Sequence, residues 1–248
     1  MIDNASISSS HILPSKLAVV PAITRQRELV DRKRGYFIVK QLFDVVFSLF
    51  FIVSVLSWLL PILCILIKLT SKGPVFFLQK RIGFGGRSFT CYKLRTMVIN
   101  EEADTRQASD NDSRITRFGW LLRKSNLDEF PQFFNILKGD MSIIGPRPHM
   151  YTDCRNFSAV LPGYKFRNMV KPGLTGLAQI KGYHGPATTR NAILLRFHWD
   201  NYYIRNIGLA LDTKIILQTV LQRVVVMTKY LWEQLQPGKK SKEEILPD

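Results

Sequence analysis

The sequence predicts an α+β fold that is mostly helical, in which a membrane helix precedes a small domain with a β-hairpin and amphipathic helices. Three observations predict it: an uncharged apolar run at residues 45–67, two strand-like segments between residues 75 and 94, and a long apolar segment with scattered charges at 209–231. We divide the chain into a polar tail at 1–35, the membrane helix at 36–70, the domain at 71–232 and a charged tail at 233–248.

The apolar run at residues 45–67 is the clearest of these signals. As a straight helix rising ~1.5 Å per residue it would reach roughly 34 Å, enough to cross the hydrocarbon core of a bilayer. Its polar side chains are Ser48, Ser54 and Ser57, so it lacks the charged face of a soluble surface helix. The run therefore belongs in lipid.

Two features predict that this helix is re-entrant, entering and leaving the membrane by the same face. Pro61 has no N–H to donate to the carbonyl of Ser57, so we expect the helix to break at Ser57 and Pro61. An ordinary kinked transmembrane helix is the alternative. Lys and Arg favour the cytoplasmic side of a membrane, and they flank both ends of the run: Arg32, Lys33, Arg34 and Lys40 before it, and Lys68, Lys72, Lys80, Arg81 and Arg87 after it.

The charge and the cysteines narrow the range of partners and compartments. A formal net charge of +16 over 248 residues suits anionic lipid headgroups or phosphorylated substrates. Nucleic acid is disfavoured, because no base-reading motif accompanies the charge. Cys64, Cys91 and Cys154 are odd in number and far apart, which argues against a disulfide framework or a cysteine zinc site. We therefore expect a domain that faces the reducing cytosol.

The domain begins with a predicted hairpin and ends with a predicted long helix. Residues 75–80 and 88–94 have the pattern of two strands joined by a glycine-rich turn at 83–86. No Gly-Lys-Ser/Thr follows these glycines, so a hairpin turn is favoured over a phosphate loop. Residues 209–231 carry too many charges to span a membrane, and they either pack on the domain or lie in the interface.

Asp128 and Glu129 form an acidic pair in a basic region of the sequence. One interpretation is a helix start, because Ser125 to Asp128 loosely match a capping box and the helix dipole favours acids in a first turn. The other is chemical: adjacent helix residues point about 100° apart, so one carboxylate can face a phosphorus while the other binds a divalent cation. The helix that follows has a predicted buried face and a glycine stop: Phe130, Phe133, Phe134, Leu137 and Gly139.

Three basic residues elsewhere are further candidates for anion binding. Arg147 lies between Pro146 and Pro148, which fix the backbone on both sides and present the guanidinium rigidly. A plain turn with an exposed arginine is the alternative. Lys93 and Arg95 end the second predicted strand, where they either bind an anion or form a solvated edge.

Seven motifs in one order resemble the bacterial sugar transferase family, the monotopic phosphoglycosyl transferases that begin surface glycan synthesis. The likeness covers about residues 40–220 and is to a short form of the family. The motifs are Lys40-Gln41-Leu42-Phe43-Asp44, Gly73-Pro74-Val75-Phe76-Phe77, Tyr92-Lys93-Leu94-Arg95-Thr96-Met97, Leu127-Asp128-Glu129-Phe130-Pro131-Gln132, Leu137-Lys138-Gly139-Asp140-Met141-Ser142, Gly145-Pro146-Arg147-Pro148 and Lys171-Pro172-Gly173-Leu174-Thr175-Gly176.

The resemblance implies an enzyme of the bacterial inner membrane with its catalytic domain on the cytosolic face. It implies transfer of a sugar 1-phosphate from a UDP-sugar to undecaprenyl phosphate, with release of UMP. Asp128 matches the family's nucleophile and Glu129 a residue that helps to hold Mg²⁺. The phosphate and the nucleotide would be bound by basic side chains: Lys93, Arg95, Arg123 and Arg147.

The sequence departs from the family pattern at one point, and one alternative function remains. Many family members have Ser-Pro at the helix break, whereas here Trp58 follows Ser57 and Pro61 comes a turn later. The alternative function is a non-catalytic membrane-surface module that binds anionic lipid or a glycan-assembly partner, and it would tolerate loss of Asp128 and Glu129. The resemblance leaves open which sugar is transferred and whether identical chains associate as a homo-oligomer. It is compatible with synthesis of exopolysaccharide, capsule or lipopolysaccharide O-antigen.

Overall fold

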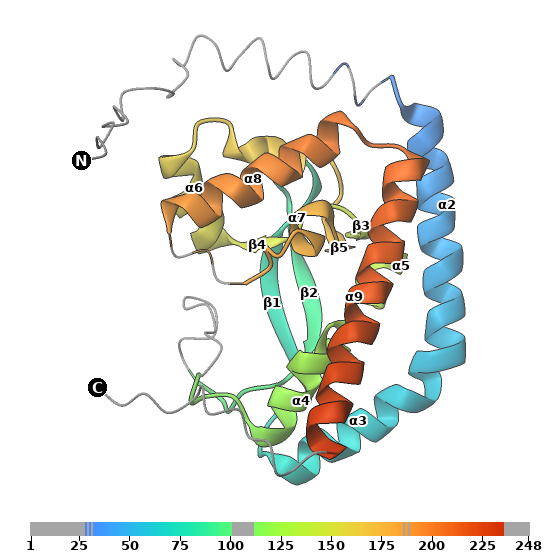
Figure 1. Cartoon of the computed structure of the whole chain (residues 1–248), viewed down its shortest axis with the longest axis vertical. Helices are drawn as coiled ribbons and strands as arrows, with labels where there is room; N and C mark the ends of the chain where they lie inside the picture. The colour runs from blue at the N-terminus through green and yellow to red at the C-terminus, as the bar shows by residue number, and fades with distance from the viewer. Residues whose placement is uncertain are drawn as a thin grey trace, which may run out of the picture.

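The structure is a computed structural model that describes residues 28, 30, 32–100, 112–185, 187 and 189–235. Within these residues the fold is mostly helical, as predicted, and it contains two small sheets (Figure 1). Most of the predicted tail at 1–35 and nearly all of the one at 233–248 lie outside the described residues. The three cysteines are free thiols, as expected.

The predicted membrane helix is one helical segment from Arg34 to Thr70, long and apolar enough to cross a membrane by length and composition. It bends between α2 (Arg34–Phe51) and α3 (Ser57–Thr70), as Figure 1 shows. A π-helical turn at Ile52–Leu56 occupies the bend.

The predicted break at Ser57 and Pro61 is therefore displaced by about one turn. Pro61 lies inside α3, and Ser57 follows the π turn, with its hydroxyl donating to the carbonyl of Val53 at 2.6 Å. A π turn inserts one extra residue into a helix and commonly marks a bend. Here it lets Leu56 point into the protein, where that side chain is fully buried.

A polar stripe on α2, formed by Lys40, Asp44 and Ser48, fastens the helix to the domain. These residues are spaced four apart and share one face, and they are 8%, 2% and 0% exposed. Lys40 Nζ lies 2.7 Å from the Asp212 carboxylate, and Asp44 accepts a hydrogen bond from the backbone N–H of Ile143 at 3.0 Å. The structure thus corrects the interpretation of Lys40 as a basic residue that flanks the membrane: its side chain is buried in an ion pair inside the protein.

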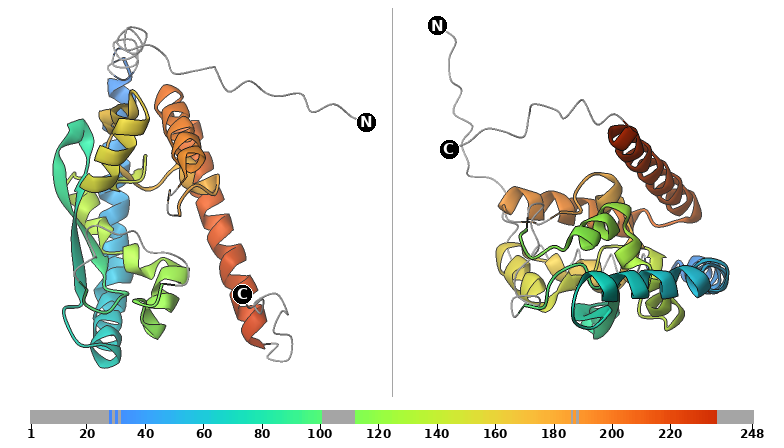
Figure 2. Two further views of the ribbon diagram at one scale, coloured as in Figure 1. Left: turned by 90° about the vertical axis from the view of Figure 1, so that its left-hand side faces the viewer. Right: turned by 90° about the horizontal axis from the view of Figure 1, so that it is seen from below.

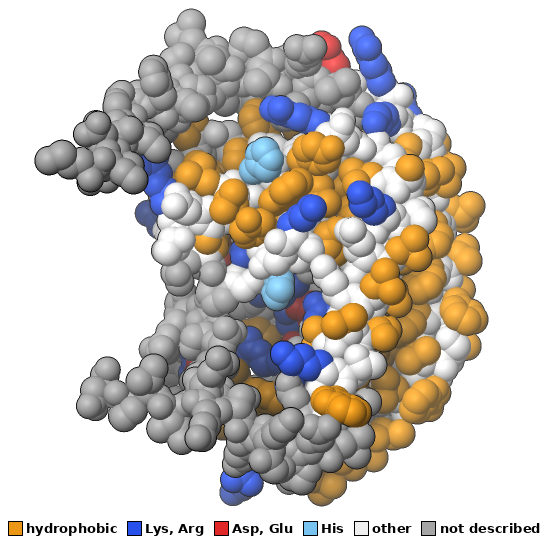
Figure 3. Space-filling view, viewed as in Figure 1, with side chains coloured by type: hydrophobic (Ala, Val, Ile, Leu, Met, Phe, Trp, Pro, Cys, Tyr) orange, Lys and Arg blue, Asp and Glu red, His pale blue; other side chains and the backbone are white. Residues whose placement is uncertain are grey.

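The opposite face of α2 is apolar and exposed. Figure 3 shows hydrophobic side chains along this outer edge of the molecule. A continuous exposed apolar surface of this kind marks a membrane or protein contact, and the charge-free composition of the run favours the membrane. The exposed residues of α2 and the π turn include Ile38, Leu42, Val46, Leu49, Phe50 and Val53.

The predicted hairpin is confirmed and gains a third strand. β1 (Phe76–Ile82) pairs antiparallel with β2 (Ser88–Leu94), with Phe77 opposite Lys93. A 3₁₀ turn at Phe84–Gly86 joins them. The short β4 (His149–Met150) pairs with the other edge of β1, so the strand order is β2-β1-β4. This pairing places the segment after Arg147 against the hairpin.

A second sheet brings two of the glycine-containing motifs together. β3 (Ser142–Ile144) pairs in parallel with β5 (Gly173–Thr175). Beyond the strands, Gly145 N–H donates to Thr175 O at 2.9 Å and Gly173 N–H donates to Pro146 O at 3.0 Å. A Cβ on Gly173 would lie 2.0 Å from Gly145 N, so both residues must be glycine for the backbones to approach.

Helices pack around these sheets and enclose the main core. Phe133, Ile136, Tyr203 and Ile215 are buried there together with Leu56. The helices are α4 (Arg117–Ser125), α5 (Gln132–Leu137), α6 (Tyr151–Val160), α7 (Leu177–Ile180), α8 (Arg190–Arg205) and α9 (Leu209–Leu235), with a 3₁₀ segment at Tyr164–Met169 between α6 and β5.

The last helix, α9, packs on the domain, which confirms one of the two predicted alternatives, and it also exposes apolar surface. Ile215 is buried, and Gln222 Nε2 donates to Ile180 O at 2.8 Å. Leu217 and Leu221 are exposed on the other side. Figure 2 shows the hairpin and α9 on opposite sides of the molecule, with the C-terminal half of α9 diverging from α2.

Replacing Asp44 should test how strongly the polar stripe holds the helix to the domain. Asp44→Leu leaves the Ile143 N–H buried without an acceptor, which costs about 1–3 kcal/mol. We expect a lower thermal unfolding midpoint in detergent, and a smaller loss for Asp44→Asn because its amide oxygen can still accept. Ser54→Ala is the matched control, since the exposed Ser54 hydroxyl bonds only within its own helix, to Phe50 O. Equal midpoints for Asp44→Leu and Ser54→Ala would contradict the prediction.

Candidate active site

The acidic pair lies in a tight connection between two helices. Asn126 adopts a left-handed conformation, with φ of 58°, which asparagine tolerates better than most residues. It ends α4 and leads into a 3₁₀ turn at Leu127–Glu129. The predicted capping box is wrong, because the Ser125 hydroxyl donates back to Leu121 O at 2.8 Å inside α4. The helix with the phenylalanine face starts later, at Gln132, and Gly139 follows it with φ of 80°, as predicted.

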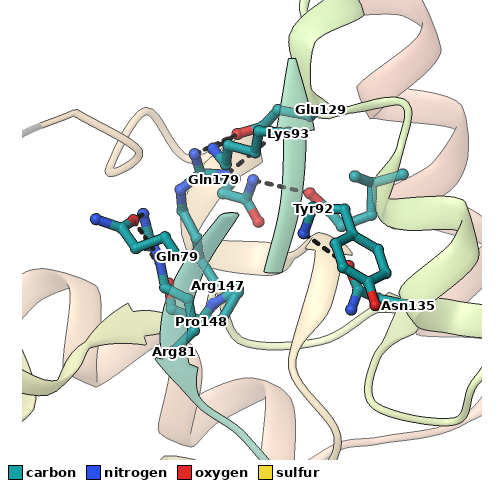
Figure 4. Close-up of polar contacts among 10 residues, drawn as sticks. Gln79, Arg81, Tyr92, Lys93, Glu129, Asn135, Arg147, Pro148 and Gln179 are labelled. Carbon is teal, nitrogen blue, oxygen red and sulfur yellow. Dashed lines mark hydrogen bonds and ion pairs between the residues drawn. The ribbon is translucent and has the colours of Figure 1, made fainter. Parts of the chain in front are cut away.

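Glu129 is held by two cations that come from distant parts of the chain (Figure 4). Lys93 Nζ, on β2, lies 2.6 Å from Glu129 Oε1. Arg147 Nη2 lies 2.6 Å from the same oxygen, and Nη1 lies 3.3 Å from Oε2. Burial opposes ionisation of Glu129, but Arg147 and Lys93 outweigh it and hold the pKa of this carboxyl well below its usual range.

Asp128 is in the opposite situation. Within the described residues no group donates a hydrogen bond to its carboxylate, although the side chain is only 9% exposed. Burial, opposed by Lys93 and reinforced by the Glu129 charge, raises the pKa of Asp128 from 3.8 to about 6. The pair therefore consists of one charged carboxylate held by two cations and one that lines the cavity and accepts no hydrogen bond from the described residues.

Two further arginines donate hydrogen bonds to the backbone of the Pro-Arg-Pro turn that carries Arg147. Arg167 Nη2 donates to Arg147 O at 2.6 Å, and Arg81 Nη1 donates to Pro148 O at 2.8 Å. Arg167 is in turn paired with Asp200 at 2.9 Å. The alternative of a plain turn with an exposed arginine is wrong, because the Arg147 guanidinium donates hydrogen bonds to the Glu129 carboxylate.

The acidic pair of Asp128 and Glu129, called the dyad from here on, opens into a cavity of about 870 Å³ whose lining is strongly basic. Among the described residues, nine Lys and Arg side chains line it, against three acids. In Figure 3 Lys and Arg side chains gather around an opening in the middle of the face. Such a surplus of positive charge favours a polyanionic ligand. The basic residues are Arg81, Lys93, Arg95, Arg114, Arg123, Lys124, Arg147, Arg196 and Arg223, and the acids are Asp128, Glu129 and Asp153.

Four of the six residues predicted for the active site lie together: Lys93, Asp128, Glu129 and Arg147. Arg123 lines the same cavity, and its charge acts on Asp128.

Arg95 also lines the cavity, but its guanidinium donates to the carbonyls of Lys72 and Ser71, the latter at 2.9 Å. These bonds connect Arg95, just after β2, to the turn that follows α3. A contact from Arg95 to substrate phosphate stays a prediction.

Several cavity residues were not found from the sequence, because each belongs to a segment with no local signal. His149 is buried between Tyr164 and Arg196, and burial, with the surrounding arginines, holds its pKa well below the usual range. Gln179 lines the cavity, and its Oε1 is buried without a hydrogen-bond partner in the described residues. Arg223 reaches the cavity from α9.

The described acids fit Mg²⁺, the ion that the resemblance implies, if substrate supplies further ligands. No group of three His, Cys, Asp or Glu side chains gathers as a metal site in the described part of the chain. Mg²⁺ does not need one, since it is usually bound by one or two carboxylates together with substrate phosphates. Glu129 Oε2 accepts one hydrogen bond, at 3.3 Å from Arg147 Nη1, and so keeps coordination capacity.

Comparison with known proteins decides the family. Residues 35–226 match the family described as bacterial sugar transferase. The chain belongs to this family. The match begins at the start of the membrane helix and ends within α9, so it includes the dyad, the Pro-Arg-Pro turn and every cavity residue up to Val226.

Curated relatives carry names that agree with one another. A UDP-glucose:undecaprenyl-phosphate glucose-1-phosphate transferase of Xanthomonas campestris pv. campestris is 39% identical over 217 residues, 87% of this chain and 45% of the relative. A UDP-N-acetylgalactosamine-undecaprenyl-phosphate N-acetylgalactosaminephosphotransferase of Aeromonas hydrophila is 47% identical over 63% of this chain and 37% of its own length. The exopolysaccharide production protein PSS of Rhizobium leguminosarum bv. phaseoli is 38% identical, over 75% of this chain and 96% of the relative. The chain thus spans less than half the length of the first two relatives.

The two carboxylates should affect folding stability in opposite directions. The raised pKa of Asp128 means that the folded state holds this proton more tightly than the unfolded chain, so its ionisation destabilises the fold as pH rises from about 4 to above 6. Asp128→Asn removes that cost, and we expect it to stabilise the protein by about 1–3 kcal/mol near neutral pH and little near pH 4.

Glu129→Gln should instead destabilise the protein. It leaves Lys93 and Arg147 buried beside a neutral amide, and an unpaired buried charge costs a few kcal/mol. Thermal unfolding of both variants and the wild type at several pH values measures the effect. Destabilisation of similar size in both variants would contradict the separate roles that the ion pairs indicate.

Proposed function

We propose that this protein transfers a sugar 1-phosphate from a UDP-sugar to undecaprenyl phosphate, releasing UMP and initiating a surface polysaccharide. A carboxylate oxygen of Asp128 attacks the phosphorus that bears the sugar, and the bond from this phosphorus to the UMP oxygen breaks. An oxygen of undecaprenyl phosphate then attacks the same phosphorus, and the bond to Asp128 breaks. The products are the sugar-diphosphate lipid and free Asp128, and neither step requires a proton transfer.

The observation that carries this proposal is the difference between the two carboxylates. Glu129 accepts three hydrogen bonds from Lys93 and Arg147, so its negative charge is already paired with cations of the protein. Asp128 has none in the described residues and lines the cavity. With a pKa of about 6, Asp128 is ionised at neutral pH without a general base, while its basicity exceeds that of an ordinary aspartate.

The basic lining supplies what an anionic nucleophile and an anionic substrate need. The charges of Arg123, Arg147 and Lys93 lie around Asp128, and they offset the repulsion between the carboxylate and a diphosphate. Mg²⁺, when bound by Glu129 and phosphate oxygens, adds Lewis-acid stabilisation of the charge on the departing UMP. The relatives' names support the donor and acceptor classes but differ in the sugar.

We further propose that the membrane helix is re-entrant, with the domain on the cytosolic face of the inner membrane. The domain contacts this helix from end to end. Lys33 donates to Ile207 O at one end, Phe51 stacks on Phe133 in the middle, and Ile67 packs in a cluster with Leu94 and Leu122 near the other end. A helix spanning a hydrocarbon core of ~30 Å would bury this whole polar domain in lipid, whereas a bent helix lying in one leaflet does not.

Loss of Asp128 should abolish the chemistry before the lipid is involved. With labelled UDP-sugar and no lipid, the wild type should acquire the label covalently and release UMP, and added undecaprenyl phosphate should remove the label. We expect Asp128→Asn to show no labelling and at least a thousandfold lower turnover, since a nucleophile has no substitute. UDP-glucose and UDP-N-acetylgalactosamine are the first donors to try.

Two results would contradict the covalent mechanism: near-normal turnover by Asp128→Asn, or UMP release that requires both substrates together. A non-catalytic membrane-surface module would show no UMP release with any donor and would keep its membrane binding after loss of both carboxylates.

Thiol labelling of intact cells tests the membrane topology. Single cysteines at Ser10 and at Ser241, in a background without Cys64, Cys91 and Cys154, report the location of the two ends of the chain. We expect an impermeant reagent to label neither site until the membrane is opened, because both ends lie in the cytosol. Labelling of the Ser10 site in intact cells, with the Ser241 site protected, would establish a spanning helix instead.

A further inference from the structure

The helix α9 has two faces of different character. At about 100° per residue, Leu217, Leu221, Val224 and Val225 lie on one side, and all four are more than half exposed. The other side carries Ile215, which is fully buried. Arg223 and Val226 also lie away from the exposed side and line the cavity. One helix therefore connects an exposed apolar surface with the basic cavity.

Arg223 is a cation without a counterion in a half-buried position. No hydrogen bond or ion pair to its guanidinium is found in the described residues, and Arg123 is the other cavity cation of this kind. The remaining cavity cations are held by carbonyl oxygens, by Gln79, by Glu129 or by Asp112, or lie over an aromatic ring. A partly desolvated charge is unfavourable unless an anion compensates it.

Arg223 also lies within electrostatic reach of the dyad. Burial lowers the pKa of its guanidinium, while the Glu129 and Asp128 charges raise it and Arg147 lowers it further. The helix is fixed at this point, because the neighbouring Gln222 donates to Ile180 O and Thr219 bonds Thr175 at 2.8 Å. The guanidinium is thus presented to the cavity by an anchored backbone.

We propose that Arg223 binds the phosphate of the acceptor lipid, whose hydrocarbon tail lies along the apolar face of α9. This inference rests on the proposed function. A polyprenyl phosphate must place its phosphate beside Asp128 while its tail stays in the bilayer, and α9 offers both surfaces within one turn. The α2–α3 helix is more apolar than α9, but none of its residues lines the cavity.

Direct binding measures this role without requiring turnover. The Asp128→Asn protein, embedded in lipid nanodiscs, is titrated with undecaprenyl phosphate and, separately, with undecaprenol, which has the same tail and no phosphate. Adding Arg223→Ala should weaken undecaprenyl phosphate binding about tenfold or more, the effect of losing a charge-assisted hydrogen bond, and leave undecaprenol binding unchanged. Arg223→Lys should restore part of the affinity. Lys214→Ala is the matched control, since this exposed cation on α9 lies outside the cavity lining.

Half-reactions with the Asp128 enzyme separate the acceptor from the donor. Arg223→Ala should raise the KM for undecaprenyl phosphate about tenfold or more and leave UMP release from UDP-sugar alone within twofold of wild type. Equal loss in both half-reactions would assign Arg223 to the donor and overturn the proposal. So would unchanged lipid affinity, or equal weakening of undecaprenol and undecaprenyl phosphate. Failure of the wild type to release UMP from any donor refutes the proposed function, while the binding titration still decides whether Arg223 holds a lipid phosphate.

Discussion

The contact between the polar stripe of α2 and the domain is the constraint on which the rest of the structure depends. Lys40 and Asp44 are charged residues on a helix that otherwise belongs in lipid, and a charge facing hydrocarbon is costly. The domain supplies a partner for both: Lys40 forms an ion pair with Asp212, whose carboxylate also accepts from Tyr36 at 2.6 Å and from Tyr203 at 3.0 Å, and Asp44 accepts a hydrogen bond from the N–H of Ile143. The stripe thus decides which face of the helix meets the protein, and the remaining apolar face is left for the membrane.

The same contact positions the reactive groups. Ile143, which Asp44 holds, lies in β3 just before the turn that carries Arg147. Phe51 stacks on Phe133 with ring centroids 4.2 Å apart and meets Phe130 edge-on, and those rings follow directly after the dyad. The membrane helix therefore touches both segments that form the Glu129–Arg147 ion pair. Because these supports belong to the membrane helix, the depth of the dyad relative to the bilayer is set by the fold itself.

The sequence predicts the parts of this site that have local signals and misses those that depend on long-range contacts. The hairpin that carries Lys93 and the proline-flanked Arg147 follow from turn chemistry and strand alternation, and the motif order indicates Asp128 and Glu129. The left-handed Asn126, the burial of Lys40 against Asp212 and the approach of Arg223 do not follow, because each arises from segments that are distant in sequence. Lys40 shows the reason most clearly: a basic residue beside an apolar run is usually a membrane flank, and only the partner 172 positions later along the chain makes it a core residue.

The charge distribution of the cavity suggests how one small site can serve two phosphates in turn. Lys93 and Arg147 both pair with Glu129, whose single negative charge offsets only one of their two positive charges, so together they attract an incoming phosphate less strongly than two unpaired cations would. The two cavity arginines for which the described part of the chain supplies no hydrogen bond or ion pair are on separate helices, Arg123 on α4 and Arg223 on α9. Binding an anion at one leaves the other uncompensated, so the cavity keeps positive potential after the first phosphate has arrived. In the proposed reaction, Arg123 and Arg223 would therefore let the cavity attract the phosphate of an acceptor while a donor phosphate is held on Asp128.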